Sequence, residues 1–243
     1  MSLIKKNQFL PVDDNTSSDF AGTDTKKLLE NNLKTQTGNW EYRNKPVRYT
    51  FNNRGYRTAE FKKIDWANSI VLFGCSIVFG VGLDDADTIS SQLEKITGIP
   101  VVNLGVSGSS ITYSLHNSII LKDGYPTPKA VVHLWTEHNR TTYYRRNRIQ
   151  SYGPWNLEKN NYMDVWSNSN HHAATHALMA SITNKHLWSN TSYYEASFFS
   201  ETANLINCNY LKTEDHARDL IHPGIKTSRN TAIKIADNLK CKQ

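Results

Sequence analysis

The chain has 243 residues and a formal net charge of +6, from 28 basic and 22 acidic side chains. This length is enough for one sizeable α/β domain with its own core, plus arms. The charge excess is too small to predict a nucleic-acid partner, and no apolar run approaches the roughly 20 residues that a membrane helix needs.

The number and spacing of the cysteines indicate the redox environment of the protein. Cys75, Cys208 and Cys241 are an odd and scattered set, which argues against a disulfide framework and favours a reducing environment. The residues after Met1 are polar, so no secretory signal is visible. We therefore expect a soluble cytoplasmic protein with no membrane partner.

The beginning of the chain differs in composition from the rest. Residues 1–45 are polar and rich in Asn, Asp, Thr and Lys, and they predict an N-terminal arm before a main domain at residues 46–243. One helix is predicted inside this arm, at residues 24–33. Residues 48–61 predict a strand or hairpin that turns at residues 53–55.

The first clear strand is the apolar run at residues 69–73, which a glycine-rich turn and a helical pattern at residues 88–97 follow. This order is typical of parallel α/β sheets, which present functional groups at the carboxyl ends of their strands. Ser76 lies in the turn and is our candidate nucleophile. The alternatives are a serine that only caps the next helix, and a nucleophilic thiolate at Cys75.

This turn does not fit two common glycine-rich motifs. A phosphate-binding P-loop requires a lysine after its last glycine, and none follows Gly80. The nucleophile elbow of α/β-hydrolases requires a glycine two residues after the serine, where this chain has Val78. Neither of these folds is therefore expected.

Two further apolar runs, at residues 100–104 and 130–135, predict a second and a third strand. Gly108 follows the second strand and can bring its bare backbone N–H close to a bound group. Asn139 follows the third strand and offers a side-chain amide donor. Both are suitable parts of an oxyanion hole, although either turn could also be an ordinary connection.

Asp219 and His222 precede a predicted amphipathic helix at residues 225–239. In a tight turn or in the first turn of a helix, residues three apart face the same side. The Asp219 carboxylate can then bind one imidazole nitrogen and leave the other free to take a proton. With Ser76 upstream, this pair predicts the acid–base half of a serine hydrolase triad.

Several other segments have weaker interpretations. Residues 143–148 mix aromatic and basic side chains as a nucleic-acid surface does, but they favour a solvated helix face. His171, His172 and His176 lack an evident third ligand type, so we predict no metal site and no cofactor. The pair at residues 215–216 is the less favoured acid–base candidate and predicts a turn.

The middle of the chain is the least defined part. A fourth and a fifth parallel strand belong before Asp219, and residues 205–211 are the best candidate for one of them. Residues 147–170 predict a long loop, and loops of such length are usually functional or disordered. Because this loop follows Asn139, we expect it to form part of the substrate wall.

Taken together, these motifs resemble the SGNH (GDSL-like) hydrolase superfamily, whose marker Ser, Gly, Asn and His occur here in the same order. Residues 74–80 resemble its first block, residues 103–108 its second, residues 137–140 its third and residues 219–222 its last. The resemblance covers roughly residues 49–239.

The resemblance implies a three-layer α/β/α sandwich with a flavodoxin-like parallel sheet of about five strands. It implies Ser76 as nucleophile, His222 as base and Asp219 as the residue that orients the base. It also implies an oxyanion hole built from the N–H groups of Ser76 and Gly108 and the amide of Asn139. The implied activity is hydrolysis of an O-acyl ester of a small molecule or carbohydrate, with a carbohydrate acetyl ester favoured.

The chain departs from the family pattern at two places. Cys75 replaces the usual Asp before the nucleophile, and Glu137 and Arg140 flank Asn139 in the third block. Arg140 is therefore a candidate substrate-binding residue that would favour anionic substrates. The alternatives are an O-acyltransferase that uses the same site, and a catalytically degenerate hydrolase fold that serves binding or assembly. A flavodoxin-type nucleotide binder is a more distant alternative, and the sequence predicts no oligomeric state.

Overall fold

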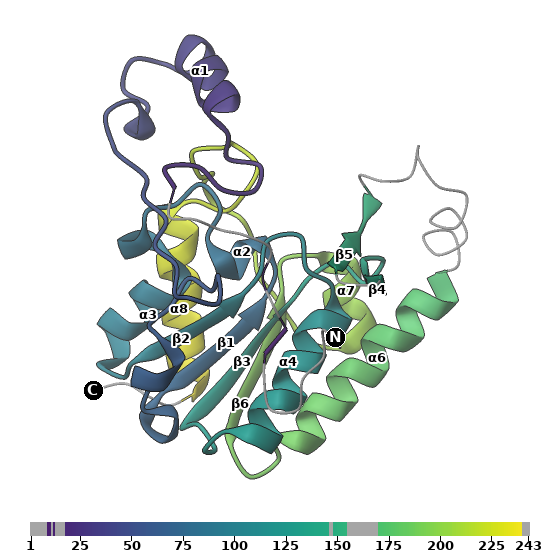
Figure 1. The fold of residues 1–243 in the computed structure, drawn as a ribbon. Helices are drawn as coiled ribbons and strands as arrows, with labels where there is room; N and C mark the ends of the chain where they lie inside the picture. The colour runs from purple at the N-terminus through teal and green to yellow at the C-terminus, as the bar shows by residue number, and fades with distance from the viewer. Residues whose placement is uncertain (1–8, 11, 13–17, 146–147, 155–169, 240–243) are drawn as a thin grey trace.

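The computed structural model describes residues 9–10, 12, 18–145, 148–154 and 170–239. Its centre is a five-stranded parallel sheet with the strand order β2-β1-β3-β6-β7 (Figure 1). The strands are β1 (Ile70–Gly74), β2 (Val101–Gly105), β3 (Ala130–Trp135), β6 (Ser192–Ser197) and β7 (Asn209–Tyr210). In chain order this arrangement reads 2-1-3-4-5, the flavodoxin-like order that the resemblance implies.

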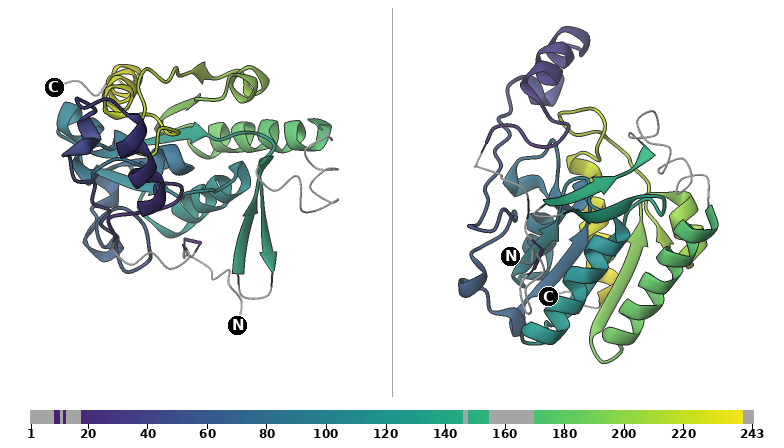
Figure 2. Two further views of the ribbon diagram at one scale, coloured as in Figure 1. Left: turned by 90° about the horizontal axis from the view of Figure 1, so that it is seen from above. Right: turned by 45° about the vertical axis from the view of Figure 1, so that its right-hand side comes forward.

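Helices cover both faces of the sheet (Figures 1 and 2). On one face lie α3 (Ile89–Thr97) and α8 (Ile225–Leu239), which also pack against each other. On the other face lie α4 (Ile111–Gly124) and α6 (Asn170–Leu187). The short α7 (Ser200–Ile206) connects β6 to β7. The predicted three-layer α/β/α sandwich is confirmed.

The strand β1 is apolar throughout because both of its faces are buried. Ile70 and Leu72 pack into the core on the side of α3 and α8, whereas Val71 and Phe73 pack into the core on the side of α4. All four side chains are fully buried. Successive side chains of a strand point to opposite faces, and a strand covered on both faces therefore carries no polar alternation.

The carboxyl ends of the first two strands are glycines that lie side by side, because Gly74 pairs with Gly105. The short helix α2 (Ser76–Phe79) packs directly on them. A Cβ added at Gly105 would lie 2.5 Å from the backbone nitrogen of Phe79, so only glycine allows this approach. The first residue of α2 is thereby held at the carboxyl edge of the sheet.

Several predicted elements are confirmed. The expected strands at residues 69–73, 100–104 and 130–135 are β1, β2 and β3, shifted by at most one residue, and the expected helix at residues 225–239 is α8. The helix predicted at residues 24–33 is α1 (Lys26–Thr35), which Thr25 caps through a hydrogen bond from the Leu28 N–H. These elements have a full apolar run, an amphipathic pattern or a local cap.

The strand or hairpin predicted at residues 48–61 is wrong. This segment is a loop with a short 3₁₀ helix, Phe61–Lys63, at its end, and Tyr49 makes one isolated bridge, to Ser18. The buried guanidinium of Arg57 donates hydrogen bonds to four backbone carbonyls, those of Arg48, Phe79, Gly80 and Leu83. This side chain organises the backbone around it and takes the place of a strand partner.

The prediction for the fourth and fifth strands is partly wrong. The fourth strand is β6, which the sequence did not define, and residues 205–211 hold only the two-residue β7 because Leu205 and Ile206 end α7. The strand β6 was not recognised in the sequence because Glu195, a buried acid in its middle, interrupts its apolar pattern. Its carboxylate accepts hydrogen bonds from Trp135 and Ser181, which make the burial tolerable.

Of the residues predicted to form a helix face, 143–145 and 148 are in strands, and 146–147 lie outside the described residues. The strands are an antiparallel pair, β4 (Thr141–Arg145) and β5 (Arg148–Tyr152), which stands apart from the main sheet (Figure 2). The loop expected at residues 147–170 therefore begins as a strand, and residues 155–169 lie outside the described residues. None of the helices in the described ranges is long and apolar enough to cross a membrane.

Candidate active site

Three residues that are far apart in the sequence meet above the carboxyl edge of the sheet. Ser76 is the first residue of α2, and Asp219 and His222 lie in the loop before α8. The Nε2 atom of His222 lies 2.8 Å from the Oγ of Ser76, and its Nδ1 lies 2.6 Å from the Oδ2 of Asp219. The structure therefore joins the three sequence-predicted residues in one continuous chain of hydrogen bonds.

The loop that carries the acid and the base is a tight turn around the Asp219 side chain. Asp219 Oδ1 accepts hydrogen bonds from the backbone N–H groups of Ile221 and His222, at 3.1 and 3.0 Å. Leu220 between them adopts a left-handed backbone with φ of 58°. The spacing of three residues thus brings acid and base together through side-chain-to-backbone bonds, as in an Asx turn.

The carboxylate of Asp219 is buried, with 1% of the residue exposed. Burial by itself raises its pKa, but the hydrogen bond and charge of His222, together with hydrogen bonds from Thr23 and the backbone, outweigh it and hold the pKa below its usual range. An ionised Asp219 accepts the proton on Nδ1 of His222. The Nε2 atom of the neutral ring is then free to accept the hydrogen bond from the Ser76 hydroxyl.

The backbone around Ser76 presents its hydroxyl to the histidine. The Phe79 N–H donates to the Cys75 carbonyl, and the Gly80 N–H donates to the Ser76 carbonyl, which closes the single turn of α2. Gly80 ends this turn with a left-handed φ of 82°. The Cys75 side chain is buried next to Ser76, at 3.8 Å between Sγ and Oγ. The imidazole reaches the hydroxyl of Ser76, and this geometry favours serine over Cys75 as the nucleophile.

Gly108 lies in the loop between β2 and α4, at the same edge of the sheet. The Val106 N–H and the Ser109 hydroxyl both donate to the carbonyl of Gly74, which ties this loop to the end of β1. Gly108 has a left-handed φ of +73°, and an added Cβ would meet nothing within 4 Å. The backbone at this glycine is therefore open to a bound group.

Asn139 lies in the turn between β3 and β4. Its Oδ1 is buried and has no hydrogen-bond partner in the described part of the chain. Among the described residues, no hydrogen bond joins Asn139 or Gly108 to Ser76. Their placement at the ends of the two strands that flank β1 agrees with an oxyanion hole, whose role for these two residues stays a prediction.

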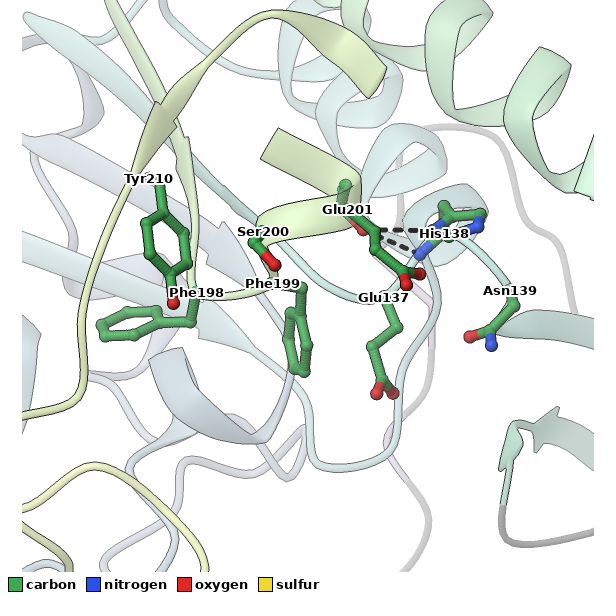
Figure 3. A pocket seen from close by; sticks show the side chains of 9 residues that line it. Glu137, His138, Asn139, Phe198, Phe199, Ser200, Glu201 and Tyr210 are labelled. Atoms are coloured by element: carbon green, nitrogen blue, oxygen red, sulfur yellow. Dashed lines mark hydrogen bonds between the residues drawn. The ribbon is translucent and has the colours of Figure 1, made fainter. Parts of the chain in front are cut away.

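A cavity of about 340 Å³ lies beside Asn139 (Figure 3). Its wall contains two carboxylates and three aromatic rings, together with His138, which faces the hydroxyl of Thr202. These carboxylates and rings belong to Glu137, Glu201, Phe198, Phe199 and Tyr210. Such a wall offers hydrogen-bond acceptors beside flat apolar surfaces.

Arg140 is paired inside the protein. Its Nε lies 2.7 Å from Glu137 Oε2, and its guanidinium lies over the ring of Phe199, 5.6 Å from the centroid. The adjacent carboxylate neutralises the charge that would attract an anionic substrate. The substrate-binding role of Arg140 stays a prediction.

The less favoured acid–base pair has a structural role. The Asp215 carboxylate accepts hydrogen bonds from the N–H groups of Lys226 and Thr227 in the first turn of α8. These bonds satisfy donors that have no partner inside the helix. His171 and His172 are exposed on α6, and the structure shows no group of three metal-binding side chains within its described ranges.

One residue of the site was missed by sequence reasoning. The Oγ1 atom of Thr23 lies 2.6 Å from Asp219 Oδ2, although 196 positions separate the two residues in the chain. Thr23 stands in a polar segment with many similar residues. No motif or spacing distinguishes it there, and only the folded chain reveals the contact.

No family model matches the chain, and no curated protein matches it in sequence. Solved structures similar to it include the acetyl xylan esterase Est2A from the rumen bacterium Butyrivibrio proteoclasticus, at 10% identity and a TM-score of 0.44. That match covers 73% of this chain and 64% of the esterase, so the chain spans less than two thirds of that protein.

Two further matches are to proteins of the lipolytic type. One is a member of the lipolytic G-D-S-L family from Veillonella parvula, at 12% identity and a TM-score of 0.42, covering 70% of this chain and 96% of that one. The other is AlinE4, an SGNH-hydrolase family esterase, at 14% identity and a TM-score of 0.37, covering 73% and 97%. All three matches have 10–14% identity to this chain and TM-scores of 0.37–0.44.

Proposed function

We propose that this chain is a serine hydrolase that cleaves O-acyl esters. The observation that carries the proposal is the continuous hydrogen-bond chain from Asp219 through His222 to Ser76, with distances of 2.6 and 2.8 Å. A serine hydroxyl is a weak nucleophile by itself, and an adjacent base oriented by a third group activates it.

The reaction proceeds in two steps. His222 takes the proton of the Ser76 hydroxyl while the Oγ atom of Ser76 attacks the ester carbonyl. The imidazolium then gives that proton to the departing alcohol. Water next attacks the acyl-enzyme, with His222 again accepting a proton, and the carboxylic acid and the free hydroxyl of Ser76 are formed. The ionised Asp219 stabilises the imidazolium in both steps.

Three donors are assigned to the oxyanion in this proposal, namely the N–H groups of Ser76 and Gly108 and the side-chain amide of Asn139. The open space at Gly108 and the position of Asn139 after β3 support the assignment. A preorganised donor of this kind typically lowers the barrier by about 3 kcal/mol.

We assign the substrate to the cavity beside Asn139, which is lined by Asn139 but not by Ser76 or His222, and its wall favours a neutral substrate that carries hydroxyl groups. Glu137 and Glu201 line it as hydrogen-bond acceptors, and Arg140 is occupied by Glu137, so its charge balance disfavours an anion. Aromatic rings beside acceptors suit the apolar faces and hydroxyls of a sugar. The proposed substrate is therefore a small or carbohydrate ester, with an acetyl group as the favoured acyl part.

The test combines a fluorophosphonate probe with the hydrolysis of p-nitrophenyl acetate. We expect the wild-type protein to react with both, and Ser76→Ala to lose labelling and at least about 1,000-fold of its turnover. Ser192→Ala is the matched control, because Ser192 begins β6 at the opposite end of the sheet and should retain full activity. Cys75→Ala should keep its labelling if serine is the nucleophile.

The other functions that the sequence leaves open give different results in the same assay. A degenerate hydrolase fold that serves binding would leave the wild-type protein unlabelled and without turnover. An O-acyltransferase would label at Ser76 and, with an added sugar, would transfer the acetyl group to the sugar hydroxyl instead of to water. Product analysis with and without the acceptor separates transfer from hydrolysis.

A further inference from the structure

Residues 18–35 of the N-terminal arm reach the proposed active site. Figure 1 shows this segment beyond the carboxyl ends of the strands, next to the loop that precedes α8. The Thr23 hydroxyl lies 2.6 Å from Asp219 Oδ2 and 3.4 Å from His222 Nδ1. The arm thus contacts the acid and the base of the proposed triad.

The Thr23 hydroxyl completes the hydrogen bonds of the Asp219 carboxylate. Oδ1 accepts the N–H groups of Ile221 and His222, and Oδ2 accepts the imidazole Nδ1–H of His222 and the hydroxyl of Thr23. An ionised carboxylate has about four acceptor positions, and each oxygen here uses two. Thr23 is the single partner of this carboxylate that comes from outside residues 219–222, among the residues that the structure describes.

A buried network holds Thr23 in place through its neighbour. Asp24 is 1% exposed and accepts hydrogen bonds from Arg218 and from the Tyr49 hydroxyl, the latter at 2.6 Å. The Arg218 carbonyl in turn accepts the side-chain amide of Asn32, at 3.0 Å. Residues 23 and 24 of the arm therefore bind residues 219 and 218 of the catalytic loop as two adjacent pairs.

The same turn of the arm also touches the other side of the site. The Asp24 N–H donates to the Ala21 carbonyl, and Gly22 between them has a left-handed φ of 61°. A Cβ added at Gly22 would lie 2.8 Å from the hydroxyl oxygen of Ser107, the neighbour of Gly108. The turn is packed between the acid–base loop and the loop of the proposed oxyanion donor.

We infer that Thr23 is a positioning residue of the active site, whose hydroxyl holds the Asp219 carboxylate and, through it, the ring of His222. This role rests on the proposed hydrolase function. Thr23 does not touch the reacting atoms, and it acts through Asp219. The arm is in this respect part of the catalytic machinery and not an appendage to it.

The experiment compares three threonine variants in the intact chain. Thr23→Val removes the hydroxyl and keeps the shape of the side chain, and Thr23→Ser keeps the hydroxyl. Thr25→Val is the matched control, because Thr25 lies in the same arm, is also exposed and caps α1 without a hydrogen bond to Asp219 or His222. The readouts are kcat and KM for p-nitrophenyl acetate, and the pH profile of kcat/KM.

We expect Thr23→Val to lower kcat by about 10- to 100-fold with little change in KM, the effect of removing a hydrogen bond to a charged group. Without that bond the carboxylate of Asp219 is less stabilised and its pKa rises, so the pH profile of kcat/KM should differ from that of the wild type. Thr23→Ser should restore most of the activity, and Thr25→Val should resemble the wild type.

Two outcomes would overturn the inference. The first is a Thr23→Val protein with the kcat and pH profile of the wild type. The second is an equal loss of activity in Thr23→Val and Thr25→Val, which would indicate that the arm only stabilises the fold. A wild-type protein without turnover would refute the proposed function instead. Thr23 would then be tested by proton NMR, where the His222 Nδ1–H resonance should shift in Thr23→Val and stay unchanged in Thr25→Val.

Discussion

Arg218 and Asp24 form a buried ion pair that links the loop of Asp219 and His222 to the arm. The Nη2 atom of Arg218 lies 2.7 Å from Asp24 Oδ2, and the two side chains are 5% and 1% exposed. Arg218 immediately precedes Asp219, so the pair fixes the point at which the chain enters the turn around the Asp219 side chain. The charge of each partner is compensated by the other in a region with little water.

The first prediction concerns this ion pair. Asp24→Asn leaves the Arg218 charge buried without its partner, and we expect a loss of about 3–5 kcal/mol in the free energy of unfolding. Asp87→Asn is the control, because it breaks the more exposed Lys45–Asp87 pair and should cost less than about 1 kcal/mol. Urea unfolding of the three proteins measures both values. Equal losses in the two variants would show that burial does not set the strength of the Arg218 pair.

The second prediction concerns the proposed amide donor. We expect Asn139→Ala to lower kcat for p-nitrophenyl acetate by about 100- to 1,000-fold and to leave KM nearly unchanged, because the donor acts on the oxyanion and not on the bound ester. Ser192→Ala, at the opposite end of the sheet, is the control and should keep the kcat and KM of the wild type. A normal kcat in Asn139→Ala would contradict the donor role and would indicate that Asn139 only closes a turn.

The third prediction concerns a histidine in the core. His133 is stacked between the rings of Phe73 and Trp135, at centroid distances of 4.7 and 4.5 Å. Neither of its ring nitrogens has a hydrogen-bond partner within the described ranges. Burial lowers the pKa of His133 from 6.5 to about 3. The ring therefore stays neutral in the folded protein at pH values where the unfolded chain already binds a proton.

Between these two values the unfolded state carries the extra proton, so the free energy of unfolding falls as the pH is lowered, by up to about 1.4 kcal/mol per pH unit. His133→Phe, which keeps the stacking, should remove this slope between pH 6.5 and 4. The low pKa of Asp219 adds its own loss of stability only below its usual carboxyl range. Urea titrations at several pH values test the slope, and His186→Gln, at an exposed position, should leave it unchanged.

The sequence was sufficient for the part of the fold in which local pattern and global position agree. The runs that became β1, β2 and β3 are apolar because both faces of the sheet are covered. The Asp219–His222 pair could be found because its geometry is local, made by bonds between residues three apart or closer. Each of these signals is contained in a short window of sequence.

The remaining features depend on contacts that no short window contains. Glu195 makes β6 look polar, and its burial is compensated by Trp135 and Ser181 from other elements. Arg57 turns an expected strand into a loop through carbonyls that lie up to 26 positions away. Thr23 belongs to the site only through a residue that comes 196 positions later. Long-range polar contacts of this kind have no periodicity from which they could be predicted.

The contact between Thr23 and Asp219 also has a consequence for biosynthesis. Thr23 leaves the ribosome 196 residues before its partner Asp219. At translation rates of about 5–20 residues per second, roughly 10–40 s pass between the synthesis of Thr23 and that of Asp219. The proposed triad can consequently form only after residues 219–222 have been made, and a nascent chain interrupted before that point holds Ser76 without its proposed base.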